Sequence, residues 1–489
     1  MEKKQQGLFY QTFHAAAWHS ISFVLVRLVS MIRTMILARL LVPEHFGQIS
    51  IVLIVIESLW AFSNIGFQSA VVQRKQLSDL FLQTAWLLVA VRGVLLAVIC
   101  WFSAPYAADF FHVAVLEGLL HWAALIPLLQ GLESMAMSLW QRELEFRKRA
   151  WIEFGREAVV TTTAVLIALI LWNDARAMVA GLIAGALFHL IMPYFMHSFR
   201  PLLRFNWSLC SELWSFGSHL LVSGLLTFAI ASLDDVVIGR LLGMEQLGYY
   251  TVAFTLASLL TIQIVQLAHR VLFPAFSSIQ EDVVKLTEAV MFALTVAVVL
   301  LSMVVGGGLA FPEGILRIIY GESWLAAALP LTLLLCSGWF RGITQVFGSV
   351  LLARGMTARL HLIRWAEFIL FATMIIPAVR NMGVSGAALT LLAVYFLGTL
   401  LMIASVSKDL AVSYTRFLSV IISGVVPAII AYLGVYLAAR WSPEVWGVTL
   451  VREIGLVLIY LILFGALLAV THRGFIGSVR SRLSRGKLA

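Results

Sequence analysis

The chain has 489 residues, of which 61% are hydrophobic and only 12% are charged. Soluble domains carry about 25% charged residues, so the composition excludes an ordinary soluble enzyme or binding domain. The formal net charge of +9 could point to nucleic acid, but in a membrane chain it more often reflects basic cytoplasmic loops.

Apolar windows of roughly 20 residues, each long enough to cross a ~30 Å hydrocarbon core, recur along the whole chain. They predict an all-α, polytopic membrane protein with about fourteen transmembrane helices. The first follows Lys3 and Lys4 and shows no clear cleavage site, which favours a retained helix over a signal peptide. The first seven lie near 13–37, 47–68, 82–103, 113–135, 153–173, 177–197 and 213–239. The second seven lie near 247–269, 286–308, 324–350, 361–377, 383–405, 417–438 and 452–471, with the eleventh ending at Pro377.

The basic residues in the loops predict the orientation. With the N-terminus inside, the cytoplasmic loops and termini hold 22 Lys and Arg residues, and the opposite loops hold seven. Positive charge accumulates on the cytoplasmic side, so both termini are predicted to lie in the cytoplasm.

A repeat divides the chain into two similar halves. The segment Leu37–Gly47 recurs 201 positions later as Ile238–Gly248, with an Arg, a Leu-Leu pair, a Glu and a Gly in register. Six predicted helices separate the copies, so both have the same orientation and the pseudo-symmetry axis lies along the membrane normal. The run Trp151–Phe154 resembles Trp365–Phe368 in the same way.

The repeat predicts three regions. They are a six-helix bundle over 1–205, a second over 206–410, and two further helices with a basic cytoplasmic tail over 411–489. Two similar halves that face each other across an axis leave a central cleft, which is the architecture of a transporter.

Several charged residues fall inside predicted helices, where each costs at least ~2.5–3.5 kcal/mol to insert. Arg27 lies in helix 1 on a polar stripe, and Glu57 lies at a similar depth in helix 2 with Asn64 on its face. This placement predicts an ion pair that lines the cleft. Arg92 lies in the middle of helix 3, and Arg341 lies in helix 10 beside Gln345.

The repeat places Arg33 and Asp234 at equivalent positions near the outer ends of helices 1 and 7, with Asp235 adjacent. Opposite charges at symmetric sites predict a gate at the outer mouth. The alternative is structural, because long side chains near helix ends reach the interface and intramembrane charges also pair for stability. Glu153, Glu157 and Glu367 are predicted to form structural pairs with arginines on their own helices.

No catalytic or cofactor motif is present. The sequence lacks a Walker loop, the HExxH zinc motif and the GxSxG nucleophile elbow, and its histidines form no ligand cluster. Cys100, Cys210 and Cys336 are isolated, as expected of packing groups. The sequence therefore predicts neither an enzyme nor a bound metal or cofactor.

Five segments resemble bacterial Wzx-type polysaccharide flippases, and the order and spacing favour the colanic-acid exporter branch. They are Leu37–Gly47, Asn64–Lys75, Gln141–Phe146, Asp235–Gly243 and Arg270–Phe276. The resemblance implies the multidrug/oligosaccharidyl-lipid/polysaccharide exporter fold, with two six-helix bundles in a V and two extra helices. It also implies a lipid-linked oligosaccharide substrate, carried on undecaprenyl pyrophosphate from the cytoplasmic to the periplasmic leaflet of the inner membrane by alternating access.

The substrate cleft is predicted to contain Arg27, Arg92, Arg341, Asn64 and Gln345, since guanidinium groups suit phosphate oxygens. Glu57, Arg33, Asp234 and Asp235 are predicted to couple or gate transport, with H+ or Na+ exchange as an open addition to the membrane potential. Membrane lipids are expected partners, and polymerase and chain-length proteins are candidates; nucleic acid is not.

Two alternatives remain open at this stage. A multidrug cation antiporter of the same superfamily would be expected to have twelve helices and a cavity rich in carboxylates. A membrane polysaccharide polymerase or ligase would be expected to have a large periplasmic loop, and no predicted external loop exceeds about 20 residues.

Overall fold

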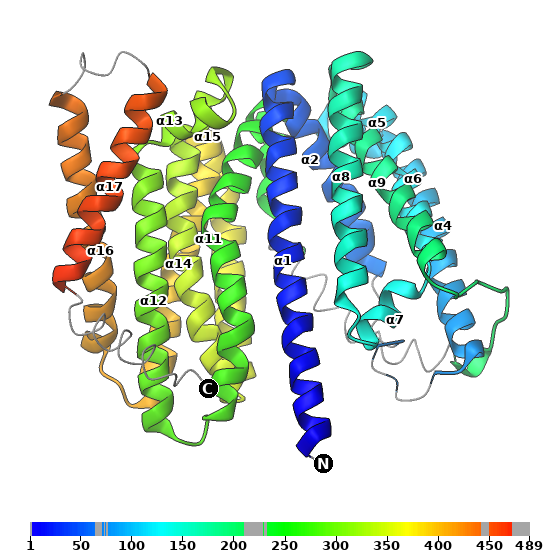
Figure 1. The fold of residues 1–489 in the computed structure, drawn as a ribbon. Helices are drawn as coiled ribbons and strands as arrows, with labels where there is room; N and C mark the ends of the chain where they lie inside the picture. Colours follow the sequence, from blue (N-terminus) through cyan, green and yellow to red (C-terminus); the bar gives the residue numbers. More distant parts are fainter. Residues whose placement is uncertain are drawn as a thin grey trace. The chain divides into compact units, whose positions relative to one another are not determined.

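A computed structural model describes residues 2–63, 71–72, 74, 77–209, 228, 232–441 and 449–471. Within these ranges the chain is helical and forms no strand, which confirms the predicted all-α class (Figure 1). Seven described helices are long and apolar enough to cross a membrane. An eighth span is counted if the pair Val115–Gly131 and Ala136–Arg142, bent by 50°, is taken as one. The protein is therefore a multi-pass membrane protein, and the number fourteen stays a prediction.

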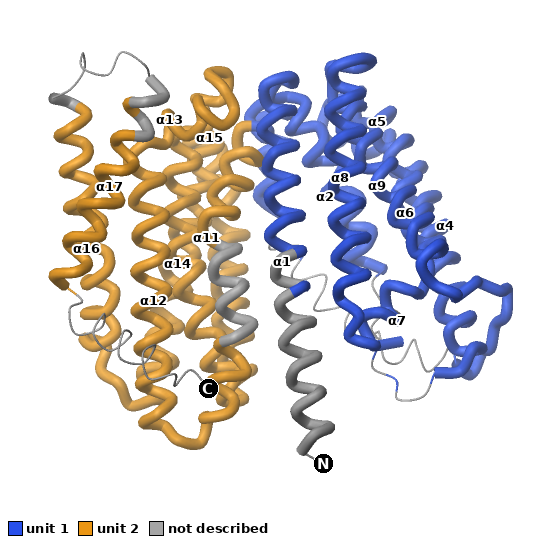
Figure 2. The backbone as a smooth tube through the Cα atoms, viewed as in Figure 1, with its two compact units in different colours: residues 1–248 blue, residues 249–489 orange. Residues whose placement is uncertain are grey.

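The helices gather into two compact units, residues 1–248 (unit 1) and residues 249–489 (unit 2) (Figure 2). In unit 1, α8 packs between α1 and α9, while α4 packs against α5 and α6. A break between α8 and α9 confirms the predicted split, and Asp174 caps α9 by accepting a hydrogen bond from the Arg176 backbone N–H. The helices are α1 (Glu2–Leu40), α2 (Pro43–Ser63), α4 (Asp79–Phe111), α5 (Val115–Ala123), α6 (Leu125–Gly131), α7 (Ala136–Arg142), α8 (Phe146–Ile170) and α9 (Ala175–Met196).

In unit 2, α14 packs against α12 and α15. The last two helices, drawn in orange and red in Figure 1, pack against each other and against α12. The elements are α11 (Met244–Ser278), which begins in unit 1, α12 (Val283–Ala310), α13 (Pro312–Ile319), η1 (Glu322–Ala327), α14 (Ala328–Ala353), α15 (Thr357–Leu410), α16 (Tyr414–Trp441) and α17 (Thr449–Thr471). The predicted helix at 213–239 lies largely outside the described residues.

The long element α15 is a helical hairpin. Its backbone turns at Gly383, where φ is 60° and ψ is −144°, a conformation that only glycine adopts readily. A Cβ at Gly386 would collide with the Ala378 carbonyl, and one at Gly398 would collide with the Glu367 carboxylate. The two halves therefore lie antiparallel and in contact. Two helices were predicted here, but the first continues through Pro377 and ends at the glycine, so the predicted end was wrong.

The two Trp-x-Glu-Phe runs adopt the same local geometry. The rings of Trp151 and Phe154 in α8 meet edge to face at 6.2 Å, and those of Trp365 and Phe368 in α15 do so at 5.9 Å. Both tryptophans are exposed, as befits rings at a membrane interface. The repeat therefore extends from sequence to side-chain arrangement.

The repeated glycines mark a reciprocal backbone contact inside unit 1. A Cβ on Gly47 of α2 would collide with the carbonyl of Met244, and a Cβ on Gly248 of α11 would collide with the carbonyl of Pro43. The offset of 201 converts one contact into the other. The two copies of the repeat thus pack through the first turns of α2 and α11, at a distance that excludes any side chain.

We expect Gly47→Ala and Gly248→Ala each to destabilise the protein by at least about 1–3 kcal/mol, because a methyl group there would force two backbones apart. The measurement is the thermal unfolding midpoint of the purified protein in detergent. Gly118→Ala in α5 is the matched control, since nothing lies within 4 Å of its Cβ position. Midpoints equal to that of the control would contradict the contact.

Candidate functional site

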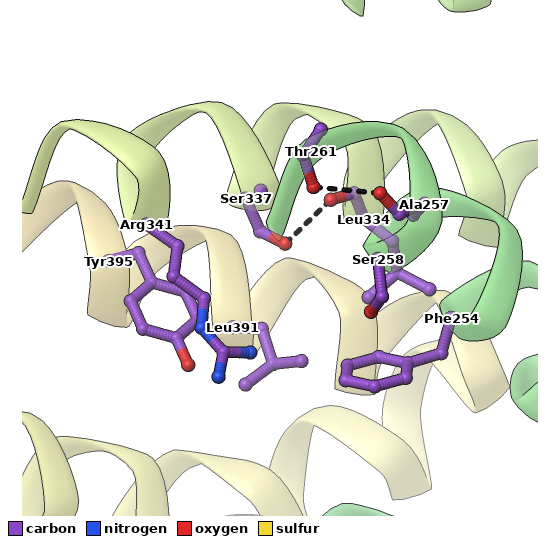
Figure 3. A pocket seen from close by; sticks show the side chains of 10 residues that line it. Phe254, Ala257, Ser258, Thr261, Leu334, Ser337, Arg341, Leu391 and Tyr395 are labelled. Carbon is purple, nitrogen blue, oxygen red and sulfur yellow. Dashed lines mark hydrogen bonds between the residues drawn. The ribbon is translucent and has the colours of Figure 1, made fainter. Parts of the chain in front are cut away.

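A polar pocket of about 230 Å³ lies within unit 2, where α11, α14 and the second half of α15 meet (Figure 3). Arg341 and Tyr395 lie on one side of it, and Ser258 and Phe254 lie on the other. Gly338 lines the wall, and its missing Cβ leaves room for the Thr261 side chain. The pocket is therefore a hollow within a helical bundle whose only charged lining residue is an arginine.

Arg341 supplies the hydrogen-bond donors of this pocket. Its guanidinium carbon lies 5.4 Å from the centroid of the Tyr395 ring, at cation–π distance. Among the described residues, no acceptor takes a hydrogen bond from the Arg341 side chain. A guanidinium carries five N–H groups in a planar fork, so this side chain can bind an anionic oxygen cluster without breaking an existing bond.

The neighbouring hydroxyls donate to their own helices. Ser337 Oγ donates to the Leu334 carbonyl at 2.8 Å, and Thr261 Oγ1 donates to the Ala257 carbonyl at 2.7 Å. Such bonds satisfy the hydroxyl protons locally and make the wall polar without adding charge. An anion in this pocket would therefore depend on Arg341.

Two further predicted substrate residues lie elsewhere. Gln345 is on α14, one turn beyond Arg341, and does not line the pocket. Asn64 lies outside the described residues. Their predicted contacts with substrate stay predictions.

Arg92 is held by protein groups of unit 1. Its Nη1 donates to the Ser63 carbonyl at 3.3 Å, and its guanidinium carbon lies 4.4 Å from the Trp60 ring centroid. The bond reaches the last turn of α2, where unpaired carbonyls make a cation favourable. These contacts give Arg92 a structural partner.

Arg27 and Glu57 do not form the predicted ion pair. Both side chains are described and both are exposed, but the guanidinium of Arg27 lies over Phe23, 5.6 Å from the ring centroid. The prediction was wrong because equal depth in two helices fixes height only. It does not determine whether the two side chains face each other.

Arg33 forms a buried ion pair with Glu157 that joins α1 to α8. Its Nη1 lies 2.6 Å from Glu157 Oε1, and its Nη2 donates to Ser30 Oγ at 3.2 Å. The side chains are 19% and 7% exposed. Glu153 pairs with Arg149 on its own helix, as predicted, whereas Glu157 finds its close partner on another helix.

The structure brings three of the predicted coupling residues together in unit 1. Asp234 is buried, and Asp235 lies within electrostatic range of both Asp234 and Glu57. No group of three or more possible metal ligands occurs in the part of the chain that was searched, which is the described part. The three carboxylates are thus a cluster of negative charge without metal-site geometry.

Sequence reasoning missed most of the pocket. Ser337 lies one turn before Arg341, so a helical projection from Arg341 would have identified it. Tyr395 and Ser258 come from other helices, and no pattern along the chain links them to Arg341. Only the packing of α11 and the α15 hairpin against α14 brings them together.

Comparisons with known proteins match this architecture. Residues 36–329 match the model of the family described as "Polysaccharide biosynthesis protein". The chain is 25% identical over 393 residues to the lipopolysaccharide biosynthesis protein WzxC of Escherichia coli K12, covering 80% of each. It is 26% identical to the teichuronic acid biosynthesis protein TuaB of Bacillus subtilis 168, covering 71% of this chain and 72% of that one.

Two kinds of solved structure share the fold. The lipid II flippase MurJ in an inward closed conformation matches with a TM-score of 0.76 at 14% identity, covering 94% of this chain and 99% of that one. The multidrug transporter VcmN of Vibrio cholerae matches with a TM-score of 0.56 at 11% identity, covering 84% and 99%. At these identities the likeness establishes the polytopic fold of this transporter superfamily.

The Arg33–Glu157 pair generates a test of structure against gating. Arg33→Ala or Glu157→Ala should each cost about 3–5 kcal/mol, because either leaves an uncompensated buried charge. The double variant Arg33→Met with Glu157→Met should recover most of that stability. Thermal unfolding in detergent measures both. Export in cells is then decisive for the gate, because loss of export by a stable double variant would support gating and full export would exclude it.

Proposed function

Because the chain belongs to the family of polysaccharide biosynthesis proteins, we propose that it is a flippase for a lipid-linked oligosaccharide. It moves a repeat unit on undecaprenyl pyrophosphate from the cytoplasmic to the periplasmic leaflet by alternating access. The relatives named for polysaccharide synthesis and the fold shared with a lipid II flippase support this proposal. Such a protein is a transporter and carries out no covalent step.

The pocket at Arg341 is the observation that carries the proposal. A sugar head group cannot cross hydrocarbon without a polar path, whereas a polyprenyl chain can stay in lipid. Sites for drug-sized ligands have volumes of about 300–1,000 Å³, so a pocket of about 230 Å³ fits a phosphate end group better than an oligosaccharide. The guanidinium fork of Arg341 matches phosphate oxygens, and the Tyr395 ring supplies an adjacent stacking surface.

The remaining predicted residues have unequal support. Arg27 is exposed and without a carboxylate partner among the described side chains, so it stays a candidate for the pyrophosphate. Arg92 is already bonded to α2, which weakens its candidacy. For coupling, the negative cluster of Glu57, Asp234 and Asp235 is a candidate for H+ or Na+, beside the membrane potential, which supplies up to ~2.3 kcal/mol per charge per 100 mV.

The flippase explains more of the chain than a multidrug cation antiporter does. The match to the flippase structure covers 94% of the chain, and that to the multidrug transporter covers 84%. The only charged residue lining the described pocket is a cation, which repels cationic drugs. We place the protein in the bacterial inner membrane with both termini in the cytoplasm, with membrane lipids as partners and polymerase and chain-length proteins as candidate partners.

We expect Arg341→Ala to lower export at least tenfold, because one charge-assisted hydrogen bond contributes about 1.5–3 kcal/mol. Arg341→Lys should be intermediate, since it keeps the charge but loses the fork. The measurement is surface polysaccharide in a strain that lacks the native gene, together with the leaflet in which lipid-linked repeat units accumulate.

A flippase defect leaves complete units on lipid in the inner leaflet, whereas a polymerase defect lets single units reach the outer one. Arg359→Ala is the control, because Arg359 is an exposed arginine of unit 2 away from the pocket. Full export by Arg341→Ala at normal protein abundance would remove this pocket from the transport path.

A further inference from the structure

A buried glutamate stands beside the Arg341 pocket without lining it. Glu367 lies in the first half of α15 and is only 5% exposed. Its Oε2 accepts a hydrogen bond from Arg364 Nη1 at 2.7 Å, one turn earlier on the same helix. Arg341, from α14, is the second cation whose charge acts on it.

The second carboxylate oxygen has no fixed partner. Glu367 Oε1 is buried and accepts no hydrogen bond within the described part of the chain. It lies against Gly398 in the other half of the hairpin, where a Cβ would collide with it. The missing side chain at position 398 therefore makes the space that this oxygen occupies. A buried acceptor without a donor is costly, which calls for an explanation beyond packing.

The pocket side of the cluster is equally incomplete. The Arg341 guanidinium makes a cation–π contact with Tyr395 and donates no hydrogen bond to a described residue. The next residue back, Phe340, is fixed to the second half of α15 because its carbonyl accepts a hydrogen bond from Thr399 Oγ1 at 3.3 Å. The backbone beside Arg341 is thus anchored to the helix that borders Glu367, and the Arg341 head group is left with unused donors.

We propose that Glu367 is a positioning counter-charge for Arg341, and that it sets how tightly the pocket holds an anionic head group. This inference rests on the proposed function, with the pyrophosphate as that head group. Two arginines and one glutamate give the cluster a net charge of +1. When the pocket is empty, Glu367 stabilises the unpaired guanidinium at membrane depth; when a phosphate arrives, the carboxylate opposes it and favours release.

The chemistry explains why a transporter would keep this opposing charge. A site that only attracted pyrophosphate would hold it, and transport requires release in the other leaflet. Arg364 tunes the balance, because it neutralises most of the Glu367 charge through a direct bond. Without Arg364, the carboxylate would act on Arg341 undiminished.

The test uses two substitutions that should move binding in opposite directions. Glu367→Gln removes the opposing charge and should tighten binding of an anion by on the order of tenfold. Arg364→Gln frees the carboxylate to compete for Arg341 and should weaken binding by a similar factor. The measurement is the dissociation constant of geranyl pyrophosphate, a short soluble probe, for the purified full-length protein in detergent at low salt.

Glu153→Gln is the matched control, because Glu153 occupies the equivalent Trp-x-Glu-Phe run of unit 1 and pairs with Arg149 at 2.9 Å. It should leave binding unchanged. Export in cells should fall for Glu367→Gln although its binding is tighter, since release becomes slower.

The outcomes separate this inference from the proposed function. If the wild-type protein binds the probe and Arg341→Ala abolishes binding, but both substitutions weaken or neither changes it, Glu367 is only structural and the inference fails. If the wild-type protein does not bind the probe, or binds it equally well without Arg341, the pocket assignment itself fails. Should Glu367→Gln not fold, Arg364→Gln still decides, because unchanged or tighter binding by it overturns the inference.

Discussion

The cost of placing charge in hydrocarbon governs how this protein is built. Each arginine within a membrane-spanning helix needs an acceptor, an aromatic face or water, and the structure shows which each one has. Arg33 is satisfied by Glu157 and Ser30, and Arg92 by the Ser63 carbonyl and the Trp60 ring. Arg341 has an aromatic face but no described hydrogen-bond acceptor. The residue whose donors remain unused is the one that lines a pocket, and this difference separates a binding group from structural ones.

Close backbone packing positions that group. Helices in lipid gain little from burying apolar surface against each other, so they associate through small residues that let their backbones touch. Gly47 and Gly248 do so reciprocally between the two copies of the repeat, and Gly93 and Gly131 face each other between α4 and α6. In unit 2, Gly386 and Gly398 hold the two halves of α15 together. Only that hairpin brings Tyr395 and Glu367 to the same neighbourhood as Arg341.

The two units use the same local devices for different ends. Each contains a Trp-x-Glu-Phe run whose glutamate pairs with an arginine on its own helix, Glu153 with Arg149 and Glu367 with Arg364. In unit 1 that pair is half-exposed, and the buried carboxylate of α8 is Glu157, which binds Arg33 directly. In unit 2 the buried carboxylate is Glu367 itself, one oxygen is left unbonded, and Arg341 stays accessible to a ligand. A shared plan therefore yields a closed ion pair in one unit and an incomplete one in the other.

The sequence by itself determined the all-α membrane class, the break between α8 and α9, the two helices of α15, the repeat and the presence of Arg341 in a helix, because hydropathy and helical period are properties of one segment. It could not decide which charges meet. Arg33 and Glu157 lie 124 residues apart, and the predicted pair of Arg27 with Glu57 failed because depth along a helix does not fix the direction a side chain faces. The tertiary structure alone decided that α11, α14 and the α15 hairpin enclose Arg341, since those contacts depend on how separate helices rotate and pack.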